Sequence, residues 1–405
     1  MNFKKNFKTP EEIPKAAIER ANELLSNGHL FRYEPYEDSS GNSKLSDTSL
    51  FESEFRKFTG HKYAVAVNSC GSAMFLALKA SGLGYGEEVF CCSFTFGAVP
   101  SSIVHAGGKP IYIETTNDFI VDITDFQKKI AIYPNIKYFL LSYMRGHIPE
   151  LDVIQRICEE NNIVLIEDCA HALGSTWYDR DGARQVGFHG VASCFSSQSA
   201  KLINSGEGGI LVTDDEKIAA YALIAAGCYE KMYLMHNSAP DSEIIESMIK
   251  TVPNYSLRMN NLIAAILTPQ LSEISDRVKH YNELYDYLKT KLLNNSKVLL
   301  PSSTENSCRV GSSCQFSILG IDIKDSELLV ESLKKRGFAI SCFGQSNNAR
   351  NYANWHYSYE VLPTLQKTKE IISCSFDFKI PYTFNKEDIN LLVKILDDEI
   401  SKRMN

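Results

Sequence analysis

The sequence lacks any long uninterrupted apolar run. Although 44% of its 405 residues are hydrophobic, no stretch approaches the roughly 20 apolar residues that a membrane-spanning helix needs. Residues 1–28 are polar and lack the apolar region of a secretion signal. We therefore expect a cytoplasmic protein with no membrane partner.

Concentrated charge of one sign is also missing. The 49 acidic and 42 basic residues are mixed along the chain and leave a formal net charge of -7. Nucleic-acid-binding domains usually carry a basic stripe or patch, and the sequence has none. We expect no nucleic-acid partner.

The cysteines lack the spacing of a metal site or of a disulfide framework. The chain has 11 of them, and only Cys91 and Cys92 are adjacent. No CxxC pair occurs, and the cysteine density is far below that of a small disulfide-stabilised domain. The sequence predicts reduced thiols that serve as small core residues, and no metal site.

What the sequence does contain is a regular alternation of strand-like and helical patterns. Strand-like runs occur at residues 63–68, 88–92, 110–114, 138–142, 163–167, 192–195 and 209–212. Helical patterns separate most of the earlier runs, which is typical of a mostly parallel sheet covered by helices on both faces. Ligands of such sheets bind beyond the carboxyl ends of the strands. Four polar residues fall there: Asn68, Ser93, Asp168 and Ser196.

Helix signals divide the rest of the chain. We expect a helix from Thr9–Pro10 to Gly28, a second at about 50–58, and a third at 74–80 after a turn at 70–72. After residue 271 the pattern changes to a long helix, mixed segments and a final helix from about Lys386. A chain of this length usually forms more than one domain. We expect an N-terminal helical segment (1–30), a large domain (31–270) and a smaller α+β domain (271–405).

Lys201 and Asp168 carry the strongest chemical signal. Lys201 follows one predicted strand, and Asp168 ends an earlier one. Pyridoxal 5'-phosphate (PLP) chemistry requires such a pair, because the amine holds the cofactor as a Schiff base and the carboxylate keeps its pyridine nitrogen protonated. Alone, such a lysine is usually a solvated charge and such an aspartate a helix cap. Glu167 is the rival acid, but strand alternation points it to the opposite face.

Four segments together resemble a known family. Residues 67–96, 164–174, 194–215 and 254–271 are similar, in order and spacing, to the sugar aminotransferases of the DegT/DnrJ/EryC1/StrS group. The resemblance covers nearly the whole chain and implies a fold-type-I PLP-dependent transferase of the α/β class. In it Lys201 matches the Schiff-base lysine, which can also move a proton once it is freed, and Asp168 matches the acid that faces the pyridine nitrogen.

The resemblance also implies a set of cofactor-binding residues. Those that match positions at the cofactor phosphate, ring and phenolic oxygen are Cys70, Gly71, Ser72, Phe96, His171 and Ser196. Each also has an ordinary interpretation as a turn, cap or core residue. Ser256 and Arg258 match a segment that reaches the cofactor phosphate from a partner subunit, although Ser256 stands where the family has asparagine. The resemblance therefore implies a homodimer whose active sites are shared between subunits.

Two segments bear on the substrate. Residues 31–33 and 346–357 look like those of a branch that aminates C8 of the eight-carbon sugar acid 3-deoxy-octulosonate, and Asn347 belongs to the second. Tyr143 replaces a histidine of the commoner family motif. Guanidinium groups bind carboxylate or phosphate in a bidentate fashion. The candidate anchors for such a group are Arg32, Arg145 and Arg350.

The leading hypothesis is a PLP-dependent aminotransferase that moves an amino group from glutamate to a keto or aldehyde sugar in surface-glycan or natural-product biosynthesis. Alternatives on the same fold are a PLP-dependent sugar dehydratase and a non-catalytic regulatory protein. Relatives with dehydratase activity carry histidine where this chain has Lys201, and no DNA-binding appendage is evident. A Rossmann oxidoreductase is disfavoured because no GxGxxG follows the first strand.

Overall fold

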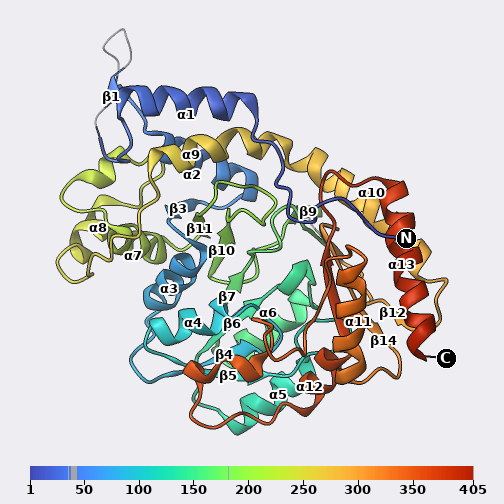
Figure 1. The fold of residues 1–405 in the computed structure, drawn as a ribbon. Coiled ribbons are helices and arrows are strands. Elements are labelled where there is room, and N and C mark those ends of the chain that lie inside the picture. Colours follow the sequence, from blue (N-terminus) through green and yellow to red (C-terminus); the bar gives the residue numbers. More distant parts are fainter. Residues whose placement is uncertain (35, 38–42, 181, 405) are drawn as a thin grey trace.

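A seven-stranded sheet forms the centre of the computed structural model, which describes residues 1–34, 36–37, 43–180 and 182–404 (Figure 1). Its strand order is β3-β11-β10-β7-β6-β4-β5. Only β11 runs antiparallel to its neighbours, so the predicted mostly parallel sheet is confirmed. The strands are β3 (Tyr63–Val67), β4 (Glu88–Cys92), β5 (Lys109–Ile113), β6 (Tyr138–Ser142), β7 (Val164–Asp168), β10 (Ala192–Ser196) and β11 (Gly209–Thr213).

Both faces of this sheet are buried, as an α/β arrangement requires. Along β6, Leu140 packs into one core and Leu141 into the other, because successive side chains point to opposite faces. One face is covered by α3 (Cys70–Ala80), α4 (Ala98–His105) and α7 (Glu216–Ala226). The other is covered by α2 (Asp47–Thr59), α5 (Ile123–Ile132), α6 (Leu151–Glu160) and α9 (Asn261–Leu267).

Two predicted helix starts are wrong. The helix α1 (Lys15–Asn27) ends at Gly28 as predicted, with φ 82° at that glycine, but it begins after Pro14 and not at Thr9. The preceding residues are non-helical, and the Glu11 carboxylate is engaged by Tyr281 and Arg277 of the later chain. The predicted turn at 70–72 is instead the first turn of α3.

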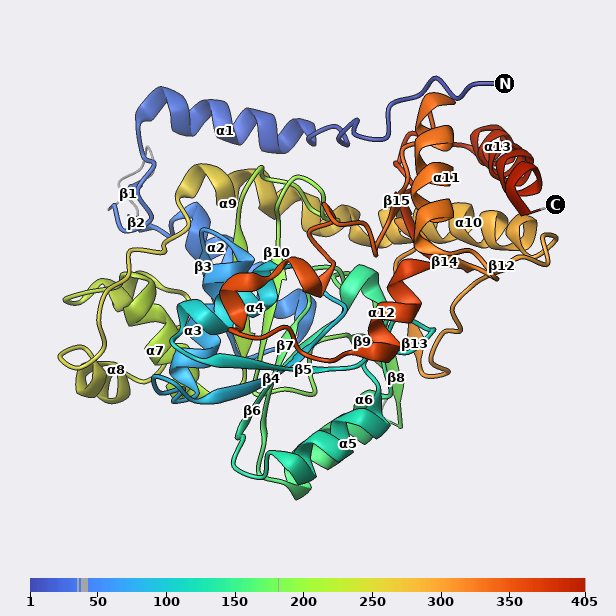
Figure 2. The same ribbon diagram turned by 60° about the horizontal axis from the view of Figure 1, so that its bottom comes forward.

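The C-terminal part of the chain forms a second core. The long helix α10 (Ile274–Leu292) leads into a four-stranded sheet of order β12-β14-β16-β15, which packs with α11 (Ile323–Lys335) and α13 (Lys386–Met404). Its strands are β12 (Val298–Leu299), β14 (Ser313–Ile318), β15 (Ser341–Cys342) and β16 (Ser375–Lys379). Phe3 and Phe7 join this core, and both chain ends lie beside it in Figures 1 and 2. The division of the chain at residues 30 and 270 stays a proposal.

The remaining elements are short. They are β1 (Tyr36–Glu37), β2 (Ser43–Lys44), β8 (Thr176–Asp179), β9 (Gly182–Gln185), β13 (Ser307–Cys308), α8 (Ser242–Met248) and α12 (Gln366–Ser373). Strands β13, β8 and β9 form a small separate sheet. Within the described ranges, no helix has the length and apolar character that crossing a bilayer demands.

Candidate active site

The carboxyl ends of the parallel strands gather the predicted catalytic residues. Asp168 ends β7, and its Cα is in register with that of Ser142, which ends the neighbouring β6. Lys201 lies in the loop after β10, whose Cys194 is in register with Asp168 on the other side. The site therefore lies where ligands of parallel α/β sheets bind.

Asp168 is a buried carboxylate held by several donors. Its Oδ2 accepts a 2.7 Å hydrogen bond from the Ser142 hydroxyl, which in turn accepts one of 2.7 Å from Thr95. Its Oδ1 accepts bonds from the Ala170 N–H at 3.1 Å and the Cys70 thiol at 3.8 Å. Burial raises the pKa of Asp168, and the Ser142 bond, the Ala170 bond and the Lys201 charge oppose that rise. The carboxylate is thus fixed in orientation before any ligand binds.

Glu167 and Tyr143 lie on the opposite face of the sheet from Asp168. Glu167 accepts hydrogen bonds from the Tyr143 hydroxyl, from the Ser193 hydroxyl at 3.0 Å and from the Gly190 N–H at 2.7 Å. Tyr143 is fully buried. Strand alternation separates both side chains from Lys201, so the structure does not bring Tyr143 to the site as a substrate contact.

Lys201 is paired with His171. The Lys201 Nζ lies 3.0 Å from the His171 Nε2. Burial lowers the pKa of Lys201 to about 8, against the opposing charge of Asp168, and Arg145 and Arg350 add to the lowering. Burial, and then the charge of Lys201, hold the pKa of His171 well below its usual value. A neutral imidazole can therefore accept a hydrogen bond from the lysine, and a large fraction of the amine is uncharged near pH 8.

The start of α3 forms a cradle that fits a phosphate. Ser69 caps the helix, because its hydroxyl accepts from the Ser72 N–H at 3.0 Å. Among the described residues, none accepts a hydrogen bond from the Cys70 or Gly71 N–H. Free N–H groups at a helix N-terminus favour an anion. At Gly209 a Cβ would lie 2.2 Å from the Ser69 carbonyl carbon, so only glycine lets β11 pass behind this cap.

Of two further predicted cofactor residues, Phe96 is partly exposed and Ser196 is buried. The Phe96 side chain is 44% exposed at the entry to α4, and the Arg350 guanidinium lies 5.5 Å from its ring centroid. A partly exposed aromatic ring fits stacking of a planar ring. Ser196 is buried, and its hydroxyl accepts from the Gln198 N–H at 3.3 Å. Together with the Lys201–Asp168 arrangement and the α3 cradle, these groups fit PLP.

Ser256 and Arg258 lie beside the end of β3 in their own chain. Arg258 forms an antiparallel bridge with Val67, and its guanidinium donates to the Gly227 carbonyl at 3.0 Å. Ser256 is exposed, with φ 56° and a 2.8 Å bond from its N–H to Asn254. Their contact with a partner subunit's cofactor stays a proposal.

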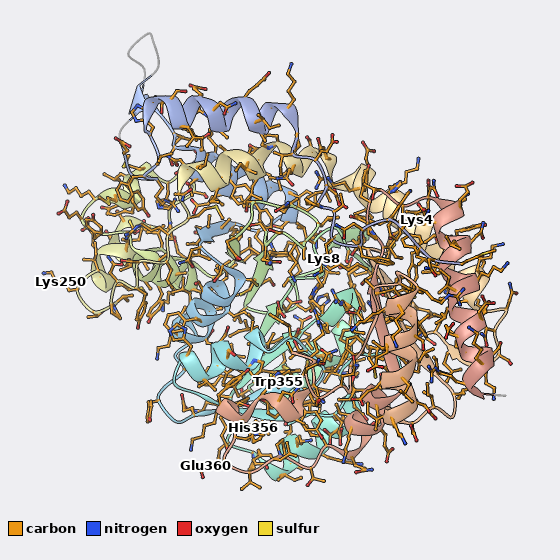
Figure 3. All side chains as sticks on the ribbon, viewed as in Figure 1. Lys4, Lys8, Lys250, Trp355, His356 and Glu360 are labelled. Carbon is orange, nitrogen blue, oxygen red and sulfur yellow. The ribbon has the colours of Figure 1, made fainter. Side chains whose placement is uncertain are left out.

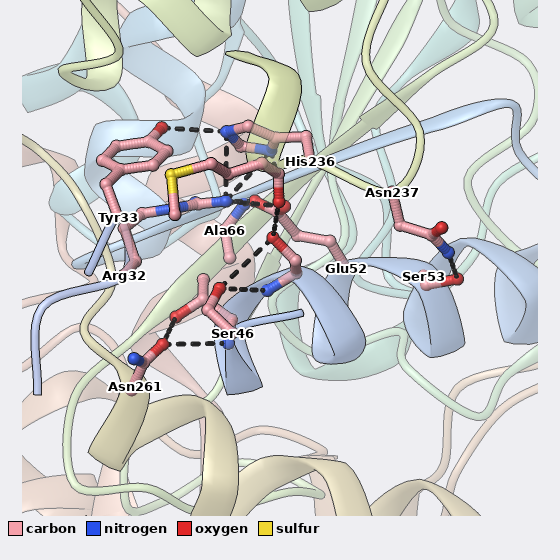
Figure 4. Close-up of polar contacts among 12 residues, drawn as sticks. Arg32, Tyr33, Ser46, Glu52, Ser53, Ala66, His236, Asn237 and Asn261 are labelled. Atoms are coloured by element: carbon pink, nitrogen blue, oxygen red, sulfur yellow. Dashed lines mark hydrogen bonds and ion pairs between the residues drawn. The ribbon is translucent and has the colours of Figure 1, made fainter. Parts of the chain in front are cut away.

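Arg32 is not brought to this site. It lies in a buried cluster, where its guanidinium donates two 2.8 Å hydrogen bonds to Glu52 and contacts His236 at 3.0 Å (Figure 4). Tyr33 and the Ala66 N–H complete the cluster. Because Glu52 already occupies the guanidinium, Arg32 is not available as a substrate anchor, and Glu52 itself links α2 to β3 by accepting from the Ala66 N–H.

The other substrate candidates are spread around the site. Arg145 is buried next to Lys201, with an ion pair of 2.5 Å to Asp377 of β16 and a φ of 57°. Arg350 approaches Phe96, whereas Asn347 is exposed in the loop before it. Ser142, although placed at a predicted strand end, was not identified as an Asp168 partner from the sequence.

Comparison with known proteins gives the class. A model of the DegT/DnrJ/EryC1/StrS aminotransferase family matches residues 37–397, and the chain belongs to this family. It is therefore placed among the PLP-dependent sugar aminotransferases, as the motifs predicted. A sugar aminotransferase of Streptococcus pneumoniae in its PLP form shares the fold, with a TM-score of 0.81 and 18% identity over 100% of both chains.

Curated relatives show similarity over about two thirds of the chain. The spore coat polysaccharide biosynthesis protein SpsC of Bacillus subtilis is 31% identical, over 69% of this chain and 68% of its own length. A GDP-perosamine synthase of Escherichia coli is 28% identical, over 62% of this chain and 64% of its own.

Proposed function

We propose that this protein transfers an amino group from glutamate to a keto or aldehyde carbon of a sugar, with PLP held covalently through Lys201. The observation that carries the proposal is the convergence of a lysine of lowered pKa and a buried, oriented carboxylate at one edge of the sheet. When bound, PLP supplies a ring that withdraws electrons from the carbon losing a proton.

Each protein group then has a defined task. Lys201 supplies the amine that holds the cofactor, and once freed its Nζ takes up and returns the proton of the reacting carbon. His171 accepts a hydrogen bond from this amine at 3.0 Å. Asp168, oriented by Ser142, stabilises positive charge on the ring nitrogen. The N–H groups of Cys70 and Gly71 bind the phosphate dianion.

The substrate class is narrowed by the relatives. One relative is named for spore coat polysaccharide biosynthesis and one for perosamine synthesis on a GDP carrier, which supports a nucleotide-linked sugar in glycan biosynthesis. The similarity of residues 346–357 to the octulosonate branch supports an eight-carbon sugar acid instead. Both are keto or aldehyde sugars that carry an acidic group.

We propose a cytoplasmic homodimer with shared active sites. The exposure of Ser256 leaves its hydroxyl accessible to a second subunit. A sugar dehydratase is the second candidate on this fold, and the presence of Lys201 with a neutral neighbour, His171, favours amino transfer over it. A non-catalytic regulatory role would not explain why the Asp168 carboxylate is held by several hydrogen-bond donors, nor why the N–H groups at the start of α3 are free to bind an anion.

The test is the colour and the donor reaction of the purified protein. With PLP added, the wild type should be yellow and should convert glutamate to 2-oxoglutarate, and Lys201→Ala should lose both properties. Lys250→Ala removes an exposed lysine far from the site (Figure 3) and should keep both. A colourless wild type would overturn the proposal, and a yellow protein inert toward glutamate would favour another PLP reaction.

A further inference from the structure

A pocket beside Lys201 and His171 is closed on one side by the N-terminal segment. Residues 7–11 line it together with residues of the C-terminal sheet and α10. The basic, acidic and histidine side chains of its lining are Lys8, Glu11, Arg145, His171, Lys201, Arg277 and Lys379, and its tyrosines are Tyr281 and Tyr382. The pocket therefore brings a part of the chain that precedes α1 to the reacting amine.

The N-terminal segment is anchored on both sides of Lys8. Before it, the Phe3 N–H donates to the Arg336 carbonyl at 2.7 Å, and the Phe7 ring stacks on Phe338 at 5.7 Å. After it, the Glu11 carboxylate is bound by the Tyr281 hydroxyl and lies 3.1 Å from Arg277. In Figure 3, Lys8 lies near the middle of the molecule, whereas Lys4 lies toward the C-terminal helix α13.

The pocket holds more cations than acids. Arg145 is paired with Asp377, and Arg277 with Glu11 and Glu273. Among the described residues, none forms a hydrogen bond or ion pair with the Lys379 ammonium. Burial and the charges of Arg145, Arg350 and Lys8 lower the pKa of Lys379, despite Asp377.

Arg350 is a second under-satisfied cation, and its charge acts on both Lys201 and Lys379. Its Nε is buried without a hydrogen-bond partner in the part of the chain that the structure describes, as is that of Arg145. Burial, and then the charge of Arg145, lower the pKa of Arg350 to about 10. Buried cations without counter-charges are costly, and an anionic ligand would remove that cost.

We propose that Lys8 and Lys379, beside Arg145 and Arg350, form an acid-binding subsite that holds an anionic group of a substrate next to Lys201. The inference rests on the proposed function. The anionic group is a carboxylate of the amino donor or an acidic group of the sugar, since both substrates must occupy the space beside the same amine. The cofactor phosphate has its own cradle at α3, so it does not compete for these cations.

Succinate, a dicarboxylate without an amino group, tests the subsite independently of turnover. Its binding to the PLP-loaded protein is followed by calorimetry or by the change in visible absorption. Lys8→Ala and Lys379→Ala should each weaken succinate binding about tenfold or more, since each removes a charge-assisted contact. Lys8→Arg should retain most of the affinity, and Lys4→Ala, an exposed lysine of the same segment, should leave it unchanged.

Half-reactions then separate the two sources of the anion. If Lys8→Ala raises the half-saturating glutamate concentration with an unchanged maximal rate, the subsite holds the donor carboxylate. If only the sugar half-reaction weakens, it holds the acidic sugar group. Succinate and substrate binding unaffected by Lys8→Ala and Lys379→Ala, with thermal stability equal to that of Lys4→Ala, overturns the subsite. Succinate binding does not require glutamate turnover. Loss of glutamate turnover therefore tests the proposed function, and unchanged succinate binding in the variants tests the subsite, so the two failures are distinguishable.

Discussion

The Ser142 hydroxyl donates a 2.7 Å hydrogen bond to Oδ2 of Asp168 across two neighbouring parallel strands. This bond sets the orientation of the carboxylate that must face the cofactor ring. Thr95 donates to Ser142 in turn, so a chain of hydroxyl groups holds the acid in place. The pairing of β6 with β7 therefore fixes the orientation of the Asp168 carboxylate.

Replacing Ser142 tests this positioning role. Ser142→Ala should lower the glutamate-dependent rate about tenfold, because one hydrogen bond to a charged group is lost. The cofactor should remain bound, and its visible band should shift as the ring environment changes. Steady-state kinetics and absorption spectra check this. Ser302→Ala, an exposed serine, is the control, and an unchanged Ser142→Ala enzyme would contradict the role.

Removing the charge of Asp168 has a larger expected effect. Asp168→Asn keeps the shape of the side chain but removes the charge partner of the ring nitrogen, so the rate should fall by about 100-fold or more. Cofactor binding, measured by equilibrium dialysis, should persist because the α3 cradle and Lys201 remain. Near wild-type turnover in this variant would show that the acid has no part in catalysis.

The reactivity of Lys201 should follow pH near its lowered pKa. Because the neutral amine is the reactive form, the rate at which the apo-protein captures PLP should rise as pH increases through about 8. Asp168 favours the charged form of Lys201, so in Asp168→Asn the profile should move to lower pH. Stopped-flow absorption at a series of pH values measures both. A profile that rises only near pH 10.5, the ordinary lysine value, would contradict the buried environment.

Removing one partner of the buried Arg32–Glu52 ion pair should strongly destabilise the folded protein. Glu52→Ala leaves a buried guanidinium without its partner and should lower the free energy of unfolding by about 3–5 kcal/mol. Urea unfolding measures it. Glu54→Ala, in the exposed ion pair with Lys57 on the same helix, should change stability by less than about 1 kcal/mol.

The same pair predicts a pH window. Burial alone would raise the pKa of Glu52, but the charges of Arg32 and His236 lower it from 4.5 to about 2. A carboxyl whose pKa is lowered on folding stabilises the protein above its unfolded pKa. That contribution should be lost as pH falls from about 4.5 toward 2, and Glu52→Gln should lack this part of the acid dependence. Equal acid dependence of the wild type and Glu52→Gln would contradict the assignment.

The sequence was sufficient for the central sheet because its strands are buried on both faces and read as apolar runs. The runs at 88–92 and 138–142 match β4 and β6 to the residue. The placement of Lys201 and Asp168 at the strand ends follows from the same pattern. Local periodicity could not show that Phe3 and Phe7 pack into a core formed by the chain from residue 284 onward.

Partners distant in sequence account for the remaining differences. Arg32 was a candidate anchor because guanidinium binds acids, and it does bind one, but the acid is Glu52 of its own chain. Tyr143 points away from the site, toward Glu167, because it directly follows Ser142 and successive side chains alternate between the faces of the sheet. This orientation could have been predicted from the sequence. Lys8 and Lys379 meet only through folding of the two ends of the chain, and no local motif marks them.

Mapping the covalent attachment of the cofactor tests the central claim most directly. Borohydride reduction of the PLP-loaded protein, followed by mass spectrometry of its peptides, should place the pyridoxyl group on Lys201 and on no other lysine. Attachment at a different lysine, or no attachment in a protein that is otherwise folded, would contradict the account.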